Sequence, residues 1–259
     1  MASNTQSYFE DLLPTMADKL GGEGLIEEFS NGFPLLMDSD KGVITFNSLK
    51  RNATLLGLQE LKDDDLREML REDDFDGDGA LNQMDLSNNK GLTGTLPSLI
   101  GNLNQLTTLI LIGCSFFGPI PDSIGSLQQL VFLALNANSF SGPIPPSIGN
   151  LSNLSWLDLT ENQLNGTIPV SSGSTTGLDM LVKARHFKIF DINKLTGSIP
   201  DTPGYVQTLE AICFNWNSLN GPVPSNLNNL TSVRELYLSN NNLNGPLPNL
   251  TGMNFLNSL

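Results

Sequence analysis

Apolar residues in the first 70 positions lie three or four residues apart, which is the spacing of one face of a helix. The pattern predicts four helical segments, with apolar faces formed by Phe9, Leu12, Met16 and Leu20, by Leu25, Phe29, Phe33 and Leu36, by Phe46, Leu49 and Leu56, and by Leu66, Met69 and Leu70. We expect these faces to pack together as the core of a helical N-terminal domain.

From about residue 81 the apolar pattern changes to Leu-x-x-Leu-x-Leu, followed by Gly-x-(Ile/Leu/Val)-Pro. This tetrapeptide ends at Pro97, Pro121, Pro145, Pro169, Pro200, Pro224 and Pro248, a spacing of 24 residues with one interval of 31. The alternation of Leu157 and Leu159 turns both side chains to one face of a short strand. Such units bury their leucines only against their neighbours, so the pattern predicts a solenoid of about seven repeats.

Each repeat also carries a polar anchor ahead of its proline: Asn89, Cys114, Asn138, Asn162, Asn193, Asn217 and Asn241. An Asn in this place is expected to hydrogen-bond backbone groups of the turn and so to form a ladder through the stack. Cys114 replaces one anchor and Cys213 lies four repeats away, so a disulfide between them is not expected.

Two stretches of the solenoid are irregular. The 31-residue interval contains LVKARHFKIFDIN, in which Arg185 and Lys188 take positions that should be apolar. Either seven residues are inserted there or 17 are lost from two repeats, and we favour the loss. Near the C-terminus, Leu250, Met253, Leu256 and Leu259 begin an eighth unit that stops inside its strand.

The charge divides the chain in the same place. The whole sequence has 13 basic and 27 acidic residues, a net charge of −14, and residues 1–85 alone hold 7 basic and 19 acidic ones. This balance argues against nucleic acid as a partner, and no stretch is long and apolar enough to span a membrane. The first 20 residues lack a basic start and an apolar run, so we expect a cytoplasmic location for the chain as written.

One stretch of the acidic part has the spacing of an EF-hand loop, from Asp74 to Asp85. Aspartates stand at positions 1, 3 and 5, Gly79 at position 6, an apolar residue at position 8 and an acid at position 12. The candidate ligands are the side chains of Asp74, Asp76, Asp78 and Asp85 and the carbonyl of Ala80, with Asn82 able to hold a water. A cage of hard oxygens suits Ca²⁺, with Mg²⁺ as a competitor. The alternative is a solvated acidic turn.

Two features weaken this loop. Asp85 is shorter than the Glu usual at position 12, and the following Ser-Asn-Asn-Lys-Gly does not favour an exit helix. The same residues fit the first repeat, so loop and solenoid compete for residues 81–86, and a strand there would turn Asp85 to the concave face. Upstream, residues 37–48 resemble a degenerate loop without its carboxylates, and we predict that its Ile44 pairs with Leu81 across a short β-bridge.

Aromatic and acidic side chains are predicted to share the concave face of the solenoid. They are Phe132, Trp156, Asp158, Glu161, Trp216, Glu235 and Tyr237. Because Trp and Tyr are favoured anchors of interfaces, this strip is a candidate partner-binding site, and the alternative is an ordinary solenoid surface. His186 has no Ser, Cys or acid at a diagnostic spacing, so no catalytic site is expected.

The repeat pattern LxxLxxLxLxxNxLxGxIP resembles the plant-type leucine-rich repeat, and TGTLPSLIGNLNQLTTLILIGC resembles the ectodomains of plant leucine-rich-repeat receptor-like kinases. This resemblance covers about residues 81–259. It implies a horseshoe fold that binds ligands or partner ectodomains on its concave or lateral face. The chain departs from these receptors because it has no kinase signature.

The stretches YFEDLLPTMADKL, GFPLLMDSDKGVITFNSLKRNATLLGL and REDDFDGDGALNQ resemble a small plant family that includes calcium-binding protein KIC and the PINOID-binding protein. This resemblance covers about residues 7–85 and implies one working EF-hand and calcium-dependent regulation of a kinesin-like motor or a protein kinase. The family has Glu at the position of Asp85 and an exit helix where this chain has a repeat.

We therefore expect an α+β chain. An all-α EF-hand-like domain spans residues 1–85, and an α/β-type leucine-rich-repeat horseshoe with short strands spans residues 86–259. The expected function is non-enzymatic: Ca²⁺ binding by the first part and protein binding by the second. The alternative is a receptor-kinase ectodomain fragment without calcium function, and the abrupt junction is also compatible with a fusion or mis-joining of two genes.

Overall fold

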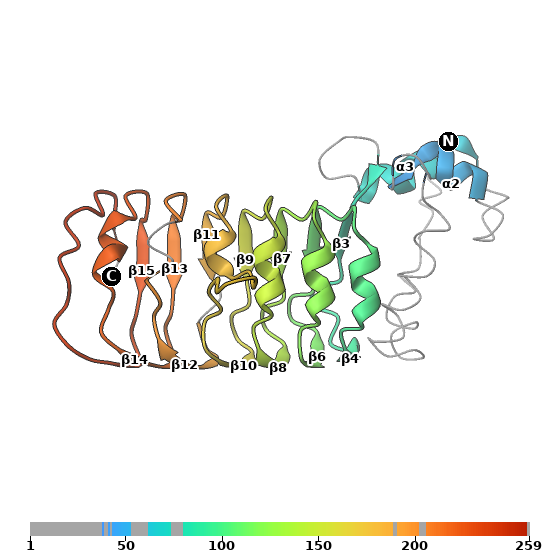
Figure 1. Ribbon diagram of the computed structural model, residues 1–259. Coiled ribbons are helices and arrows are strands. Elements are labelled where there is room, and N and C mark those ends of the chain that lie inside the picture. Colours follow the sequence, from blue (N-terminus) through green and yellow to red (C-terminus); the bar gives the residue numbers. More distant parts are fainter. Residues whose placement is uncertain are drawn as a thin grey trace, which may run out of the picture.

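The computed structural model describes residues 38, 41, 43–52, 62–73, 80–188, 191–201 and 206–257. The first predicted helical faces, over residues 9–36, lie outside this description. The described residues form a small N-terminal head and a long solenoid that extends from it (Figure 1).

The described part of the head contains two helices and one two-stranded sheet. Its elements are β1 (Ile44–Thr45), α2 (Phe46–Asn52), α3 (Asp63–Asp73) and β2 (Ala80–Leu81). The strands are antiparallel, with Ile44 opposite Leu81. This is the predicted β-bridge, and it is confirmed. Leu49 and Leu66 are buried between the helices, as the apolar spacing predicts.

Helix α2 begins at a reciprocal cap. The Thr45 N–H donates to Ser48 Oγ over 2.9 Å, and the Ser48 N–H donates to Thr45 Oγ1 over 3.3 Å. Both side chains are buried, and each satisfies a backbone donor that the first turn of a helix leaves without an intrahelical partner. The cap therefore fixes the chain direction where β1 passes into α2.

The solenoid is built on a sheet of seven parallel strands, which we call the LxL sheet because most of its strands carry that motif. They are β3 (Gln83–Asp85), β5 (Thr108–Ile110), β7 (Phe132–Ala134), β9 (Trp156–Asp158), β11 (His186–Lys188), β13 (Ala211–Cys213) and β15 (Glu235–Tyr237). Each strand pairs with the corresponding strand of the next repeat, so the predicted period is confirmed.

A second parallel sheet runs along the other edge of the repeats. Its strands are β4 (Thr93–Thr95), β6 (Ser115–Gly118), β8 (Ser139–Pro143), β10 (Gln163–Gly166), β12 (Lys194–Ser198), β14 (Ser218–Gly221) and β16 (Asn242–Leu243). Short 3₁₀ helices lie between the sheets in sequence: η2 (Ser98–Asn102), η3 (Asp122–Ser126), η4 (Pro146–Asn150), η5 (Leu178–Met180) and η7 (Ser225–Asn229). The repeat leucines are buried in one continuous core.

The anchor residues form the predicted ladder. Asn162 donates from Nδ2 to the Leu135 carbonyl of the preceding repeat over 3.0 Å, and its Oδ1 accepts the Phe140 N–H over 2.9 Å. Cys114 keeps one half of this pattern, because its Sγ donates to the Leu86 carbonyl over 3.0 Å. From Cys114 onward the anchors thus tie their own repeats to the preceding ones, whereas Asn89 bonds the Leu86 and Ser87 carbonyls of its own repeat.

The 31-residue interval is one repeat with an insertion, and our preference for residues lost from two repeats is wrong. Strands β9 and β11 are direct neighbours in the LxL sheet, with Phe187 opposite Leu157. Phe187 and Ala184 are buried, so the apolar positions are one residue away from the predicted ones, and Arg185 is exposed. All but one of the added residues lie ahead of β11, in a loop with an isolated bridge between Ser172 and Thr175, outside both sheets.

The residue before each anchor adopts a left-handed backbone. Positive φ angles occur at Asn88, Ala137, Glu161, Ile192, Trp216 and Asn240, and Gly113 takes this position before Cys114. This conformation turns the chain out of the LxL sheet, because a residue with positive φ cannot continue a strand. The anchor side chain then reaches back under the turn.

The eighth unit begins as predicted. Met253 is buried, Leu250 and Leu256 pack against the core, and the Asn257 N–H donates to the Arg234 carbonyl over 2.8 Å. Leu259 lies outside the described residues.

Candidate functional site at the junction and on the LxL sheet

The predicted calcium loop crosses from the head into the solenoid. Asp74, Asp76 and Asp78 lie outside the described residues, whereas Ala80 and Asp85 are placed. Ala80 is buried in β2, and its partner across the two-stranded sheet is Thr45. Within the described part of the chain, no three His, Cys, Asp or Glu side chains gather as metal ligands.

Asn82, the ninth position of the loop, joins the head to the second repeat. Its carbonyl oxygen accepts the Thr107 N–H over 2.8 Å, and its Oδ1 accepts from Thr107 Oγ1 over 3.0 Å. Asn82 is buried. Asn82 is the residue expected to hold a water beside the ion. Its side-chain oxygen instead accepts a hydrogen bond from the solenoid.

Asp85, the twelfth position of the loop, lies in β3 and is exposed. It stands opposite Ile110 of β5, and its Oδ1 accepts the Ser87 N–H over 2.9 Å. Three extended residues span about 10 Å and three helical residues about 5 Å, so residues 83–85 do not form the start of the exit helix that usually follows an EF-hand loop. Residues 80–81 fit a pair of EF-hand loops, whereas residues 83–85 fit a leucine-rich repeat.

The upstream turn is held by protein groups. The Asp38 N–H donates to the Val43 carbonyl over 2.9 Å, and the Lys41 N–H donates to Asp38 Oδ1 over 3.3 Å. Asp38 Oδ2 also lies 3.7 Å from the guanidinium of Arg51. Asp38 carries the one carboxylate described in this turn, and that carboxylate contacts the Lys41 N–H and the Arg51 guanidinium.

An aromatic stack crosses three strands of the LxL sheet. The rings of Phe132 and Trp156 are nearly parallel, with centroids 5.2 Å apart, and the Trp156 and His186 rings are 4.4 Å apart. The three residues are register partners on β7, β9 and β11. Aromatic contacts of this kind add to the stability of neighbouring strands.

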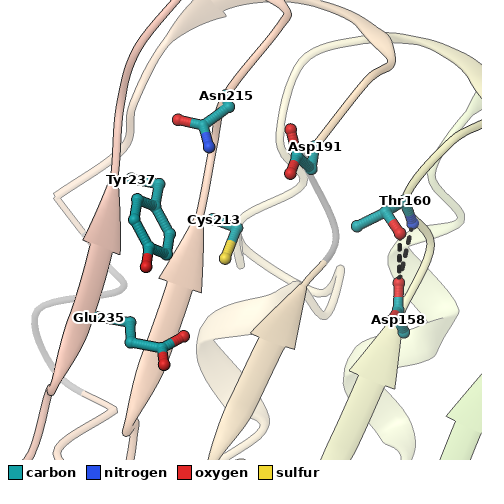
Figure 2. Close-up of a pocket in the computed structure, with 7 residues that line it drawn as sticks. All are labelled: Asp158, Thr160, Asp191, Cys213, Asn215, Glu235 and Tyr237. Carbon is teal, nitrogen blue, oxygen red and sulfur yellow. Dashed lines mark hydrogen bonds between the residues drawn. The ribbon is translucent and has the colours of Figure 1, made fainter. Parts of the chain in front are cut away.

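Beside this stack lies an open hollow of about 410 Å³, shown in Figure 2. Its walls are formed by Asp158, Thr160, Asp191, Cys213, Asn215, Glu235 and Tyr237. Asp158 Oδ1 accepts from the Thr160 N–H over 3.0 Å and from Thr160 Oγ1 over 2.8 Å, so this carboxylate is fixed in place. Burial raises the pKa of the Asp191 carboxyl, and the negative charge of Asp158 adds to the rise, against a hydrogen bond from Asn215. The hollow is acidic.

Both cysteines are free thiols and buried, as expected from their separation. Burial raises the pKa of the Cys114 thiol, and the charge of Asp85 adds to the rise, whereas a hydrogen bond with the Asn89 backbone opposes it. Cys114 therefore acts as a packing residue and weak donor.

The head matches known calcium-binding proteins. Residues 40–88 match the family described as an EF-hand domain pair. Calcium-binding protein PBP1 of Arabidopsis thaliana is 68% identical over 83 residues, which are 32% of this chain and 65% of that protein. Calcium-binding protein KIC of the same plant is 45% identical over 78 residues, 30% of this chain and 58% of that protein.

The solenoid matches plant receptor ectodomains. Residues 105–127, 129–151, 153–174 and 232–253 match the family described as Leucine Rich Repeat. The leucine-rich-repeat ectodomain of the Arabidopsis receptor kinase GASSHO1/SCHENGEN3 is 36% identical with a TM-score of 0.61, over 65% of this chain and 19% of that one. The Arabidopsis receptor kinase HAESA is 32% identical with a TM-score of 0.62, over 69% and 29%. This chain joins an EF-hand sequence to leucine-rich repeats.

The EF-hand head spans less than two thirds of each calcium-binding relative: 65% of PBP1, 64% of Arabidopsis calcium-binding protein KRP1 and 58% of KIC. Both predicted resemblances are confirmed, each for its own part of the chain. Among the described residues, none of the helices is long and apolar enough to cross a membrane.

The predicted partner-binding residues of the leucine-rich repeats fall into three places. Phe132 and Trp156 form the stack, and Asp158, Glu235 and Tyr237 border the hollow. Glu161 and Trp216 lie in the left-handed turns, beyond the strands. Sequence reasoning missed His186 as a member of the stack, and Thr160, Asp191, Cys213 and Asn215 as walls of the hollow.

Proposed function

We propose that this protein binds Ca²⁺ through the loop from Asp74 to Asp85 and binds a protein partner through the LxL sheet. The proposed ligands are the carboxylates of Asp74, Asp76, Asp78 and Asp85 and the Ala80 carbonyl oxygen, with Mg²⁺ as a competitor. The proposed role is regulatory and non-enzymatic.

The pairing of Ile44 with Leu81 is the observation that carries the calcium proposal. Leu81 is the eighth residue of the intact loop, and Ile44 is its counterpart in the upstream loop when Gly42 is aligned with Gly79. A pair of loops joined at this position is built like an EF-hand pair, and the match of residues 40–88 to that family supports it.

Calorimetry of the full chain tests the calcium proposal. Calcium should bind with measurable heat, Asp74→Ala should abolish the heat, and added Mg²⁺ should weaken the apparent affinity. Asp122→Ala is the matched control, because it removes an exposed carboxylate from η3 on the solenoid. Absence of heat, or equal heat in Asp74→Ala, would contradict the proposal.

The aromatic stack and the acidic hollow support the proposal of a protein-binding face. The hollow is bordered by the carboxylates of Asp158, Asp191 and Glu235, and Lys188 takes the register position opposite Asp158. The residues that line the hollow include three acids and neither Lys nor Arg, which favours a partner segment that offers basic side chains. A protein kinase or kinesin-like motor is the partner class that the resemblance implies for the EF-hand head, and it is a separate partner from the one proposed for this face.

Binding to an immobilised partner panel tests this face. Trp156→Ala removes the centre of the stack and Glu235→Gln removes one carboxylate of the hollow. The double variant should bind the partner more than about tenfold more weakly than the wild-type chain does. Leu247→Ala is the control, because Leu247 is exposed and lies outside the LxL sheet. Unchanged binding by the double variant would contradict the proposal.

A further inference from the structure

Two large apolar side chains lie in solvent at the edge of the acidic hollow. Ile192 is 49% exposed and Trp216 is 58% exposed. Each directly follows a residue that lines the hollow, Asp191 in the first case and Asn215 in the second. Figure 2 shows these two lining residues in the turns beyond the strand ends. Ile192 and Trp216 therefore border the hollow on that side, and we call them the edge pair.

The two residues of the edge pair come from neighbouring repeats. The Ile192 N–H donates to the Asn215 carbonyl over 3.2 Å, and the Asn193 N–H donates to the Trp216 carbonyl over 3.2 Å. The two turns thus follow one another at the strand spacing of the sheet, about 4.8 Å. Single exposed apolar residues are common on soluble proteins, whereas adjacent ones beside a polar hollow are typical of interaction sites.

The backbone at the edge pair disfavours both residues. Ile192 has a φ of 52° and Trp216 a φ of 51°, in the left-handed region that β-branched and bulky residues rarely adopt. In the other repeats the same turn position holds small or polar residues: Asn88, Gly113, Ala137, Glu161 and Asn240. The turn itself therefore does not require Ile or Trp, and unfavourable residues in an exposed place point to a role in binding.

We propose that the edge pair and the hollow together hold one partner segment, which places a large apolar side chain against Ile192 and Trp216 and a Lys or Arg side chain in the hollow. This inference rests on the proposed protein-binding face and specifies what that face recognises. The walls of the hollow select the basic residue, because they include Asp158, Asp191 and Glu235 and neither Lys nor Arg. Trp216 selects the apolar one, because an exposed Trp is a favoured anchor of interfaces.

The acidic walls are held in place by the chain itself. Asp158 Oδ1 accepts from the Thr160 N–H and from Thr160 Oγ1, and Asn215 Oδ1 accepts the Ser239 N–H over 2.9 Å. Asn215 also hydrogen-bonds to Asp191. Walls that are already ordered lower the entropic cost of binding. Because the edge pair directly follows two of the lining residues in sequence, the basic and apolar side chains must be close neighbours in the partner segment.

An array of immobilised synthetic hexapeptides tests this recognition, with the full chain as the binding protein. Each peptide combines one Lys or Arg with one Leu, Phe or Trp, at every spacing up to three residues, on a background of Ala and Ser. Matched peptides carry Glu in place of the basic residue or Ser in place of the apolar one. The wild-type chain should bind a subset of the basic and apolar peptides, and either replacement should weaken that binding by at least about tenfold.

The double variant Ile192→Asn, Trp216→Asn removes both apolar side chains and supplies the residue that two other repeats have in this turn. It should bind the selected peptides more than about tenfold more weakly than wild type does. Its melting temperature should stay the same or rise, because Asn tolerates the left-handed backbone. Ala137→Asn is the matched control, because it makes the same change in a repeat that does not line the hollow, and it should leave peptide binding unchanged.

The fluorescence of Trp216 reports contact directly. The chain has two tryptophans, so Trp156→Phe leaves Trp216 as the single one and keeps a ring in the stack. A bound peptide that carries Leu should shift the Trp216 emission to shorter wavelength, because the peptide removes the indole from water.

The outcomes separate this inference from the proposed protein-binding face. Peptide binding that is lost in Trp156→Ala, Glu235→Gln but is equal in wild type and in Ile192→Asn, Trp216→Asn, with no emission shift, would overturn the inference and leave the face standing. Loss of binding together with a lower melting temperature would assign the edge pair a structural role and would also overturn it. An array without any bound peptide would overturn the inference alone, since the partner panel tests the face independently.

Discussion

The Phe140 N–H donates to Asn162 Oδ1 over 2.9 Å, from one repeat to the anchor of the next. Asn162 is buried and also donates to the Leu135 carbonyl, so its removal leaves buried groups of two repeats without partners. We expect Asn162→Ala to reduce the free energy of unfolding by about 2 kcal/mol, measured by urea unfolding. Cys114→Ala loses only a weak S–H donor and should cost clearly less. Equal losses in the two variants would contradict this account of the ladder.

The stack of Phe132 and Trp156 should be visible as an energetic coupling. Their rings are 5.2 Å apart and nearly parallel on neighbouring strands. A double-mutant cycle with Phe132→Ala and Trp156→Ala should give a coupling energy of about 0.5–1.5 kcal/mol in chemical unfolding. Phe132 with Tyr237, which belong to distant strands β7 and β15, is the control pair and should be additive. A coupling near zero in the first pair would argue against the stack.

Gly125 lies where two repeats approach closely. A Cβ at this position would lie 2.4 Å from the Ser147 carbonyl oxygen of the next repeat, so a larger residue forces the backbone apart. Gly125→Ala is expected to destabilise the solenoid by about 1–3 kcal/mol, measured by thermal unfolding. An alanine at Gly173 meets nothing within 4 Å, and its cost is limited to the strain of a φ of 58°. Gly125→Ala should lose more stability than Gly173→Ala, and the opposite ranking would contradict the close packing at Gly125.

Asp191 should make stability depend on pH. Its pKa is raised above 3.8, chiefly by burial, so the folded protein holds this proton more tightly than the unfolded chain does. Its contribution is therefore fully present below pH 3.8 and is lost as the pH rises through the raised pKa. Relative to wild type, Asp191→Asn should gain stability as the pH rises from below 3.8 through the raised pKa, in paired thermal melts. A constant difference between wild type and variant across this range would contradict the shift.

Much of the solenoid follows from sequence because its rules are local and repeated. The alternation of Leu157 and Leu159 predicts a strand, and Asn162 predicts the ladder, in each case from spacing within a single unit. The pairing of Ile44 with Leu81 also follows from the sequence, because both residues take the eighth position of an EF-hand-type loop and paired loops are joined at that position. The period of 24 then places the neighbours of every strand.

The errors occur where spacing is ambiguous. Counting back from Asn193 places Lys188 at an apolar position, whereas the extra residue sits in the turn after Phe187, and Phe187 is the buried one. Because of this one-residue error, the sequence alignment does not place His186 beside Trp156. The two residues align once the insertion is divided between the loop and the turn. The left-handed turn at Trp216 was also beyond prediction, because a positive φ in a non-glycine residue depends on the anchor that follows it.

The inserted loop around Ser172 and Thr175 has a practical consequence. Both sheets continue across it in unbroken register, from β9 to β11 and from β10 to β12. Gly173, at its tip, has no heavy atom within 4 Å of the place where a side chain would begin. The solenoid therefore carries a built-in attachment point, at which an epitope or a fluorescent label can be introduced without entering the surfaces on which neighbouring repeats meet.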